Sequence, residues 1–148
     1  MAKDVISELN GLIQMDLNAV CAYDQAIEAC DHVEIKGKLG EFKRDHERHI
    51  TDLSSQVSVL GGTPETGQDF KGKLIEGFTA ITSHSDHSAL MAMRGNEELT
   101  NRRYASALEE ALPEGVRVVV EQNYQDEQRH LAWIKDALDR RVWEPKAA

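Results

Sequence analysis

The sequence predicts an all-α fold, a four-helix bundle made of two antiparallel hairpins that one long connection joins. Long stretches of the chain have apolar residues at helical spacing and are rich in good helix formers. The prolines, Pro64, Pro113 and Pro145, fall at the ends of these stretches or outside them. Two of the three connections are only a few residues long, which forces antiparallel neighbours. The 148 residues fit a single domain, 1–148, with one core.

The first hairpin is expected to contain helices at about 4–30 and 33–60. Asp31 lies between them and is a good N-cap residue for the second helix. The segment 61–64, Gly-Gly-Thr-Pro, predicts the end of that helix.

The second hairpin is expected to contain helices at about 86–112 and 114–141. Ser85 or Asp86 suits the N-cap of the first of these helices. Pro113 suits the start of the second, where its missing N–H costs least.

The connection between the hairpins, 61–85, is long enough to cross the length of a bundle. Its apolar residues predict a short amphipathic helix within it: Phe70, Leu74, Ile75, Phe78 and Ile81.

Charge and motifs exclude several classes of function. The formal net charge of -9 disfavours nucleic-acid binding, because such a surface repels phosphate. No apolar run approaches 18 residues, so no membrane span is expected. The first residues lack the apolar segment of a signal peptide, which favours a cytoplasmic protein. No glycine-rich phosphate loop or Gly-x-Ser-x-Gly motif is visible.

Each predicted helix carries an ionisable residue within its apolar stripe. Burying such a group without a partner costs several kcal/mol, so these groups pair or bind metal. The interruptions fall at similar heights, near the middle of each helix, and three carboxylates with three imidazoles are typical of metal-ligand chemistry. The six residues are Asp16, His46, His49, Glu97, Glu127 and His130.

Neighbouring charged residues fall off the stripes. We expect Asp45 and Arg48 to lie on a solvated face, and Asp126 to lie at the edge of its stripe. A purely structural alternative also stands, in which the six stripe residues form a hydrogen-bonded layer that fixes the register of the helices.

An internal repeat supports the polar layer. A shift of 81 residues places Asp16 on Glu97 and Tyr23 on Tyr104. The same shift also pairs residues of the second and fourth helices: Asp45 with Asp126, Arg48 with Arg129, and His49 with His130. The hairpins therefore resemble two copies of one unit around a pseudo-twofold axis.

These residues resemble the ferritin-like superfamily, nearest to its rubrerythrin-type members and to small bacterial bundles of unknown function. The resemblance covers all four helices, and its pattern is a carboxylate seven residues before a Tyr, here Asp16…Tyr23 and Glu97…Tyr104. Glu127-Gln-Arg-His130 matches the family's Glu-x-x-His, whereas His46-Glu-Arg-His49 departs from it. No Cys-x-x-Cys electron-transfer module accompanies the bundle.

The resemblance implies a site for iron, one or two ions, with manganese as the alternative, held by the six stripe residues. It implies activation of oxygen or peroxide, or the handling of iron. Tyr23 and Tyr104 are the candidate catalytic residues, as hydrogen-bond donors or electron carriers. His46 replaces a carboxylate that would bridge two ions, so a site with one tight and one weak ion, or a single ion, stays open.

The alternative function is a stress or structural bundle without turnover. Metal ions are the expected partners, and Trp133, off the apolar stripe, leaves a homodimer open.

Overall fold

The computed structural model describes residues 2–67, 78–81 and 83–145. It contains four helices in this order: α1 (Ala2–Ala29), α2 (Val33–Val59), α3 (Asp86–Leu108) and α4 (Glu114–Arg140). The described residues contain no strand. The predicted all-α four-helix bundle is confirmed.

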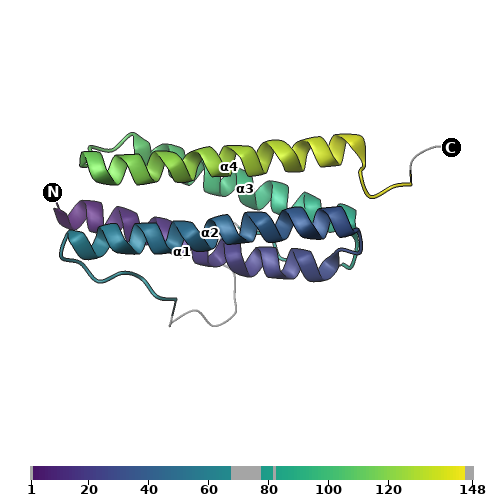
Figure 1. Cartoon of the computed structure of the whole chain (residues 1–148), viewed down its shortest axis with the longest axis horizontal. Coiled ribbons are helices and arrows are strands. Elements are labelled where there is room, and N and C mark those ends of the chain that lie inside the picture. Colours follow the sequence, from purple (N-terminus) through teal and green to yellow (C-terminus); the bar gives the residue numbers. More distant parts are fainter. Residues whose placement is uncertain (1, 68–77, 82, 146–148) are drawn as a thin grey trace.

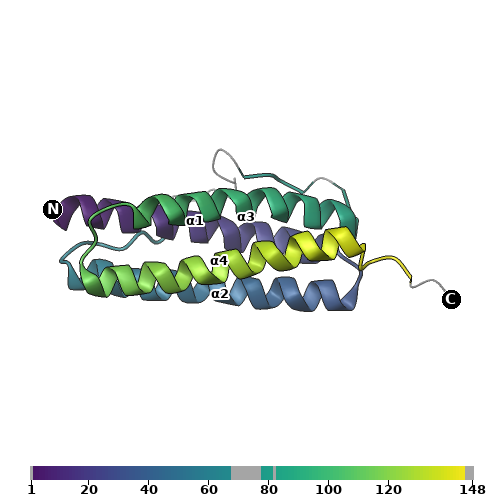
Figure 2. The same cartoon turned by 90° about the horizontal axis from the view of Figure 1, so that it is seen from above.

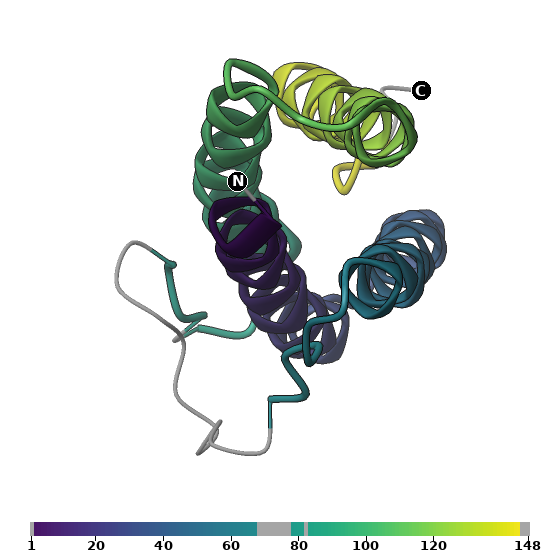
Figure 3. The ribbon, with the colours of Figure 1, turned by 90° about the vertical axis from the view of Figure 1, so that its left-hand side faces the viewer.

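The helices lie side by side with their long axes roughly aligned (Figures 1 and 2). The short turns make α1 antiparallel to α2 and α3 antiparallel to α4, while the connection 61–85 returns the chain to the other end of the bundle (Figure 1). The main contacts join α1 to α2 and α3, and α4 to α2 and α3. The end view shows the two hairpins facing each other (Figure 3).

The turn between α1 and α2 differs from the prediction in its cap. His32, not Asp31, is the N-cap of α2, and its Nδ1 accepts a hydrogen bond from the Ile35 N–H. The Asp31 carboxylate instead lies 3.0 Å from His84 Nε2. The Asp86 carboxylate accepts hydrogen bonds from the backbone N–H groups of Asp31 and His32, which ties this turn to the start of α3.

The other helix ends follow from local chemistry. Ser85 caps α3 as predicted, accepting from the Ser88 N–H at 3.0 Å. α3 ends at Leu108, four residues before the predicted 112. Its last turn is closed by the N–H groups of Glu109 and Glu110, which bond the carbonyls three residues back. Arg117 donates to the carbonyls of Leu108 and Glu110, which ties the start of α4 to the end of α3.

The segment 61–64 ends α2 as predicted. Gly61 adopts a φ of 85°, a left-handed conformation that glycine reaches without steric cost. The N–H groups of Gly61 and Gly62 then bond the carbonyls of Ser58 and Val57, which closes the last turn.

Two asparagines on the helices bond the backbone of the connection between the hairpins. Asn10 of α1 bonds the backbone of Thr63 and Glu65, and Asn96 of α3 bonds both the N–H and the carbonyl of Thr79. Most of the predicted short helix, including Phe70, Leu74 and Ile75, lies outside the described residues.

Two apolar clusters fill the bundle, and a polar layer separates them. One contains the second half of α1 and the first half of α2 and reaches Ile134 of α4. The other contains the first half of α1, the end of α2 and Val120 of α4. No described helix combines the length and the apolar character needed to cross a bilayer.

Candidate metal centre

The structure brings together all six residues that the stripes singled out. α1 contributes Asp16, α2 contributes two histidines, α3 contributes Glu97, and α4 contributes the last two. Each of the six is at most 1% exposed: Asp16, His46, His49, Glu97, Glu127 and His130. The predicted polar layer is therefore one compact cluster, with a donor from every helix.

The cluster divides into two overlapping groups of four. The first contains Asp16, His46, His49 and Glu127, and the second contains His46, Glu97, Glu127 and His130. Within each group one ligand atom per residue lies within 4.8 Å of the others. Because His46 and Glu127 belong to both groups, the cluster offers two adjacent positions that could each hold a cation and that share two residues.

Histidine–carboxylate contacts define the two positions. Asp16 Oδ1 lies 2.7 Å from His46 Nδ1 and 3.0 Å from His49 Nδ1. Glu97 Oε1 lies 3.1 Å from His46 Nε2 and 3.2 Å from His130 Nδ1. Each position thus has its own carboxylate and its own histidine, with His46 between them.

Glu127 carries the buried oxygen that most clearly lacks a partner. Its Oε2 accepts a hydrogen bond from Thr100 Oγ1 at 2.7 Å. Its Oε1 has no hydrogen-bond partner among the described residues, although His46 Nδ1 and His49 Nδ1 lie 3.3 and 3.4 Å away. A buried oxygen left without a partner is costly. The atom is placed as a metal ligand would be, so the residues present fit a bound cation.

The electrostatics of the cluster depend on close packing of opposite charges. Burial alone would lower the pKa of His46, but Glu127, Asp16 and Glu97 raise it to about 10. Burial also opposes the charged form of His49, yet Asp16 and Asp126 raise its pKa to about 12. Burial and the neighbouring Glu97 raise the pKa of Glu127 to about 7. The cluster therefore holds protons that a bound cation would displace.

The two tyrosines donate hydrogen bonds across the pseudo-twofold axis. Tyr104 of α3 donates to Asp16 Oδ2 of α1 at 2.6 Å, and Tyr23 of α1 donates to Glu97 Oε1 of α3. Both hydroxyls are fully buried, and burial next to these carboxylates raises the pKa of each tyrosine well above its ordinary value. They remain protonated donors that orient the two carboxylates.

Two outer carboxylates correct one sequence expectation. Asp45, expected on a solvated face, is 15% exposed in its side chain and lies 2.8 Å from His130 Nε2. Asp126, expected at a stripe edge, lies 3.0 Å from His49 Nε2. Both residues face the seam between α2 and α4, where a side chain beside the apolar stripe still reaches the neighbouring helix. Each fixes the imidazole so that its Nδ1 points into the cluster.

Two arginines cover these outer carboxylates. Arg129 donates to Asp45 at 2.7 Å and to Asp126 at 3.2 Å, and Arg48 contacts both aspartates in the same way. The four residues form a ring of ion pairs on the α2–α4 seam. Its members are two pairs from the 81-residue repeat, so the repeat could have placed Asp45 beside the site.

Three further polar residues escaped the sequence reasoning. Thr100 donates to Glu127, and Asn123 donates to the Tyr104 hydroxyl at 3.3 Å. Asn101 bonds the backbone carbonyls of Glu97 and Glu127, which locks α3 to α4 at the height of the cluster. Their signal in the sequence is weak, because a Thr or Asn at one stripe position is compatible with ordinary packing.

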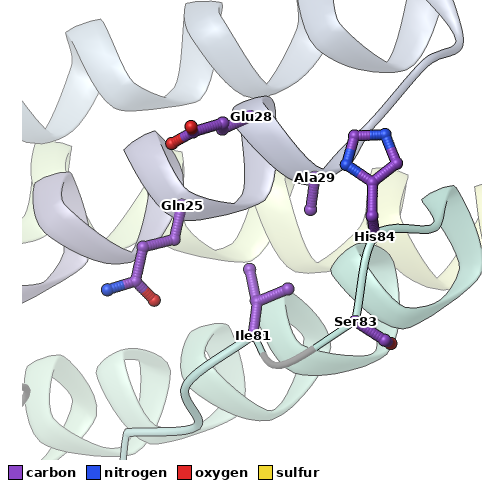
Figure 4. A pocket seen from close by; sticks show the side chains of 6 residues that line it. All are labelled: Gln25, Glu28, Ala29, Ile81, Ser83 and His84. Atoms are coloured by element: carbon purple, nitrogen blue, oxygen red, sulfur yellow. The ribbon is translucent and has the colours of Figure 1, made fainter.

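A surface pocket of about 300 Å³ lies apart from the cluster. Side chains from the end of α1 and from the segment before α3 surround it (Figure 4). None of its lining residues belongs to either four-residue group: Gln25, Glu28, Ala29, Ile81, Ser83 and His84. The six-residue cluster is thus buried inside the bundle and does not lie in the pocket.

The chain has a ferritin-like fold. Similar solved structures confirm this fold class. Residues 4–110 match the model of a domain of unknown function, DUF2383, and the chain belongs to that family. No curated protein matches the sequence.

For three of the similar structures, the match covers most of this chain and most of the similar chain. The dodecameric thioferritin of Bacteroides fragilis, a bacterioferritin-related protein, has a TM-score of 0.85 at 15% identity, over 96% of this chain and 88% of its own. A Vibrio cholerae Dps protein, described as a ferritin-like diiron-carboxylate protein, has a TM-score of 0.81 at 14% identity, covering 93% and 90%. The Desulfovibrio desulfuricans bacterioferritin, with its diiron site, has a TM-score of 0.72 at 21% identity, covering 93% and 80%.

Proposed function

We propose that the buried cluster binds two first-row transition-metal ions, iron first and manganese as the alternative, and that the protein handles iron or activates oxygen or peroxide. Carboxylate and imidazole donors together suit these ions. The observation that carries the proposal is Glu127 Oε1, a fully buried carboxylate oxygen that has no hydrogen-bond partner in the described part of the chain and lies where the two groups meet.

Each residue has a definable part in this proposal. Asp16 and His49 would hold one ion, Glu97 and His130 would hold the other, and Glu127 would give one oxygen to each. Asp45 and Asp126 would keep His130 and His49 in the tautomer whose Nδ1 is free to ligate. Bound iron would supply the redox chemistry toward oxygen or peroxide.

The tyrosines would position the ligands in this scheme. Tyr23 and Tyr104 donate to the carboxylates that terminate the two positions, which limits how these carboxylates rotate. Because both hydroxyls are buried against the cluster, they are also the side chains placed to pass an electron to it.

Metal content and Fe(II) titration test the proposal. Protein purified without chelators should contain iron or manganese, and the metal-free form should take up two Fe(II) per chain. Glu127→Ala and His49→Ala should abolish tight uptake, while Asp45→Asn should weaken it about 10–100-fold, as for an outer partner of a ligating histidine. Glu47→Gln, on the exposed side of α2, is the matched control and should leave uptake unchanged.

One observation favours a second candidate, a structural polar layer without turnover. Five carboxylates face three imidazoles and two guanidinium groups, so opposite charges balance when all are ionised. Oxygen or peroxide consumption by the reduced, iron-loaded protein separates turnover from simple binding. Absence of metal uptake would leave the structural layer as the function of the cluster.

A further inference from the structure

The two metal positions are related by the 81-residue repeat, but four of the paired residues differ. The pairs are Asp16 with Glu97, Ala19 with Thr100, Phe42 with Asn123, and His46 with Glu127. The last pair is the most consequential, because these are the two residues shared by both groups. One shared residue is a carboxylate and the other is an imidazole.

The nitrogens of His46 face different positions. Nδ1 lies 2.7 Å from Asp16 Oδ1 and 3.3 Å from Glu127 Oε1, whereas Nε2 lies 3.1 Å from Glu97 Oε1. A neutral imidazole has one nitrogen with a free lone pair, and its other nitrogen carries a proton. His46 can therefore ligate an ion at one position while it donates a hydrogen bond to the carboxylate of the other.

Glu127 has no such restriction, since each carboxylate oxygen has its own lone pairs. Its two oxygens nevertheless differ in this structure. Oε1, which faces His46 Nδ1 and His49 Nδ1, has no hydrogen-bond partner within residues 2–67, 78–81 and 83–145, while Oε2 already accepts from Thr100. The free oxygen thus lies on the Asp16 side of the cluster.

We propose that His46 makes the two positions unequal by ligating through Nδ1 at the Asp16 position, so that the two ions bind in sequence. The first ion has Asp16, His46, His49 and Glu127 Oε1. The second ion is left with Glu97, His130 and Glu127 Oε2, and the His46 Nε2–H donates to Glu97. The loss of one ligand weakens the binding of the second ion at least about tenfold. This is the lower end of the effect seen even for outer-shell partners of a ligand. This inference rests on the proposed metal site.

Calorimetric titration of the metal-free full chain with Mn(II) tests the order of binding. We expect two steps whose affinities differ at least tenfold. At one equivalent, electron paramagnetic resonance should show an isolated Mn(II), and a spin-coupled pair should appear only toward two equivalents. Two equal steps, or a coupled pair at low loading, would overturn the inference and leave the metal site intact. Absence of any Mn(II) uptake would overturn the metal site as well.

Paired variants test which position is tight. Asp16→Asn should remove the tight step, and Glu97→Gln should remove the weak step and keep the tight one. The reverse pattern would overturn the assignment of Nδ1.

A variant of His46 tests the residue itself. His46→Glu supplies a second carboxylate in the shared place, so the two affinities should come within about threefold of each other. Circular dichroism of each variant checks that it folds. If a variant does not fold, the wild-type titration still decides whether the two ions bind in sequence. If the two affinities still differ tenfold in folded His46→Glu, His46 is not the cause of that difference.

Discussion

The polar layer in the middle of the bundle and the apolar clusters on either side of it are equally buried, yet they stabilise the fold differently. The apolar clusters gain free energy whenever the chain folds, because burial removes apolar surface from water. The layer holds three carboxylates and three imidazoles whose contribution depends on which of them carry protons. The clusters therefore hold the helices together by burial alone, whereas the contribution of the layer changes with its protonation and, in the proposed function, with a bound cation.

The largest expected effect comes from the apolar clusters. Ile35 is fully buried, and Ile35→Ala should lower the free energy of unfolding by about 2–5 kcal/mol. Val33, 84% exposed in the same first turn, is the control. Val33→Ala should change the free energy of unfolding by less than about 0.5 kcal/mol. Urea denaturation measures both. Loss of Mn(II) stoichiometry in folded Ile35→Ala would show that the clusters and the layer are not separable.

Metal loading should have the next largest effect, and it acts on the layer alone. An ion at about 100 times its Kd stabilises the folded state by roughly 2.7 kcal/mol. For about 150 residues this raises Tm by about 5–10 °C. Calorimetry with and without Fe(II) or Mn(II) measures the shift. An unchanged Tm at saturating ion would favour the structural layer.

Removal of a tyrosine hydroxyl should cost about 1–3 kcal/mol in the metal-free protein. Tyr104→Phe leaves Asp16 Oδ2 without its donor and the Asn123 amide without its acceptor. Tyr124→Phe, at a half-buried position of α4, is the matched control and should change stability by less than about 0.5 kcal/mol. Equal effects of the two variants in urea denaturation would contradict the positioning role of Tyr104.

A rise in pH should lower the stability of the metal-free protein and strengthen its affinity for metal. In the metal-free protein the pKa of His46 is raised from 6.5 to about 10, and that of Glu127 from 4.5 to about 7. A raised folded-state pKa stabilises at low pH and loses that contribution as pH rises through it. The free energy of unfolding should therefore fall between pH 6 and 9, by up to about 1.4 kcal/mol per pH unit for each proton lost.

Metal affinity should rise over the same range, because protons compete with the ion for the histidines. Urea denaturation and Mn(II) titration at pH 6, 7.5 and 9 measure both trends. A metal-free protein that gains stability from pH 6 to 9 would contradict this reading of the layer.

The outer ring should give the smallest effect on stability. Arg48 and Arg129 are about half exposed in their side chains, at 50% and 48%. An ion pair so exposed contributes about 0–1 kcal/mol and is screened by salt. Arg48→Gln should therefore cost less than about 1 kcal/mol at low salt and less still at high salt. A larger, salt-independent loss would show that the ring belongs energetically to the buried layer.

The sequence was enough to predict what depends on helical periodicity. The apolar stripes predicted four helices and the shared height of the six buried ionisable residues, because 3.6-residue spacing fixes one face of a helix. Helical periodicity could not predict that Asp45 belongs to the site or that His32 caps α2. Asp45 lies beside the stripe and becomes part of the site only through the distance between α2 and α4. His32 caps α2 in a turn whose Asp31 contacts His84 and Asp86, residues more than 50 positions away.

The most direct test of the metal centre is a crystal of the metal-free protein soaked in Mn(II), with data collected for anomalous scattering from manganese. The account predicts a strong peak among Glu127 Oε1, Asp16 and His49 Nδ1, and a weaker peak between Glu97 and His130. Anomalous peaks confined to surface carboxylates, with the buried cluster empty at saturating Mn(II), would contradict it.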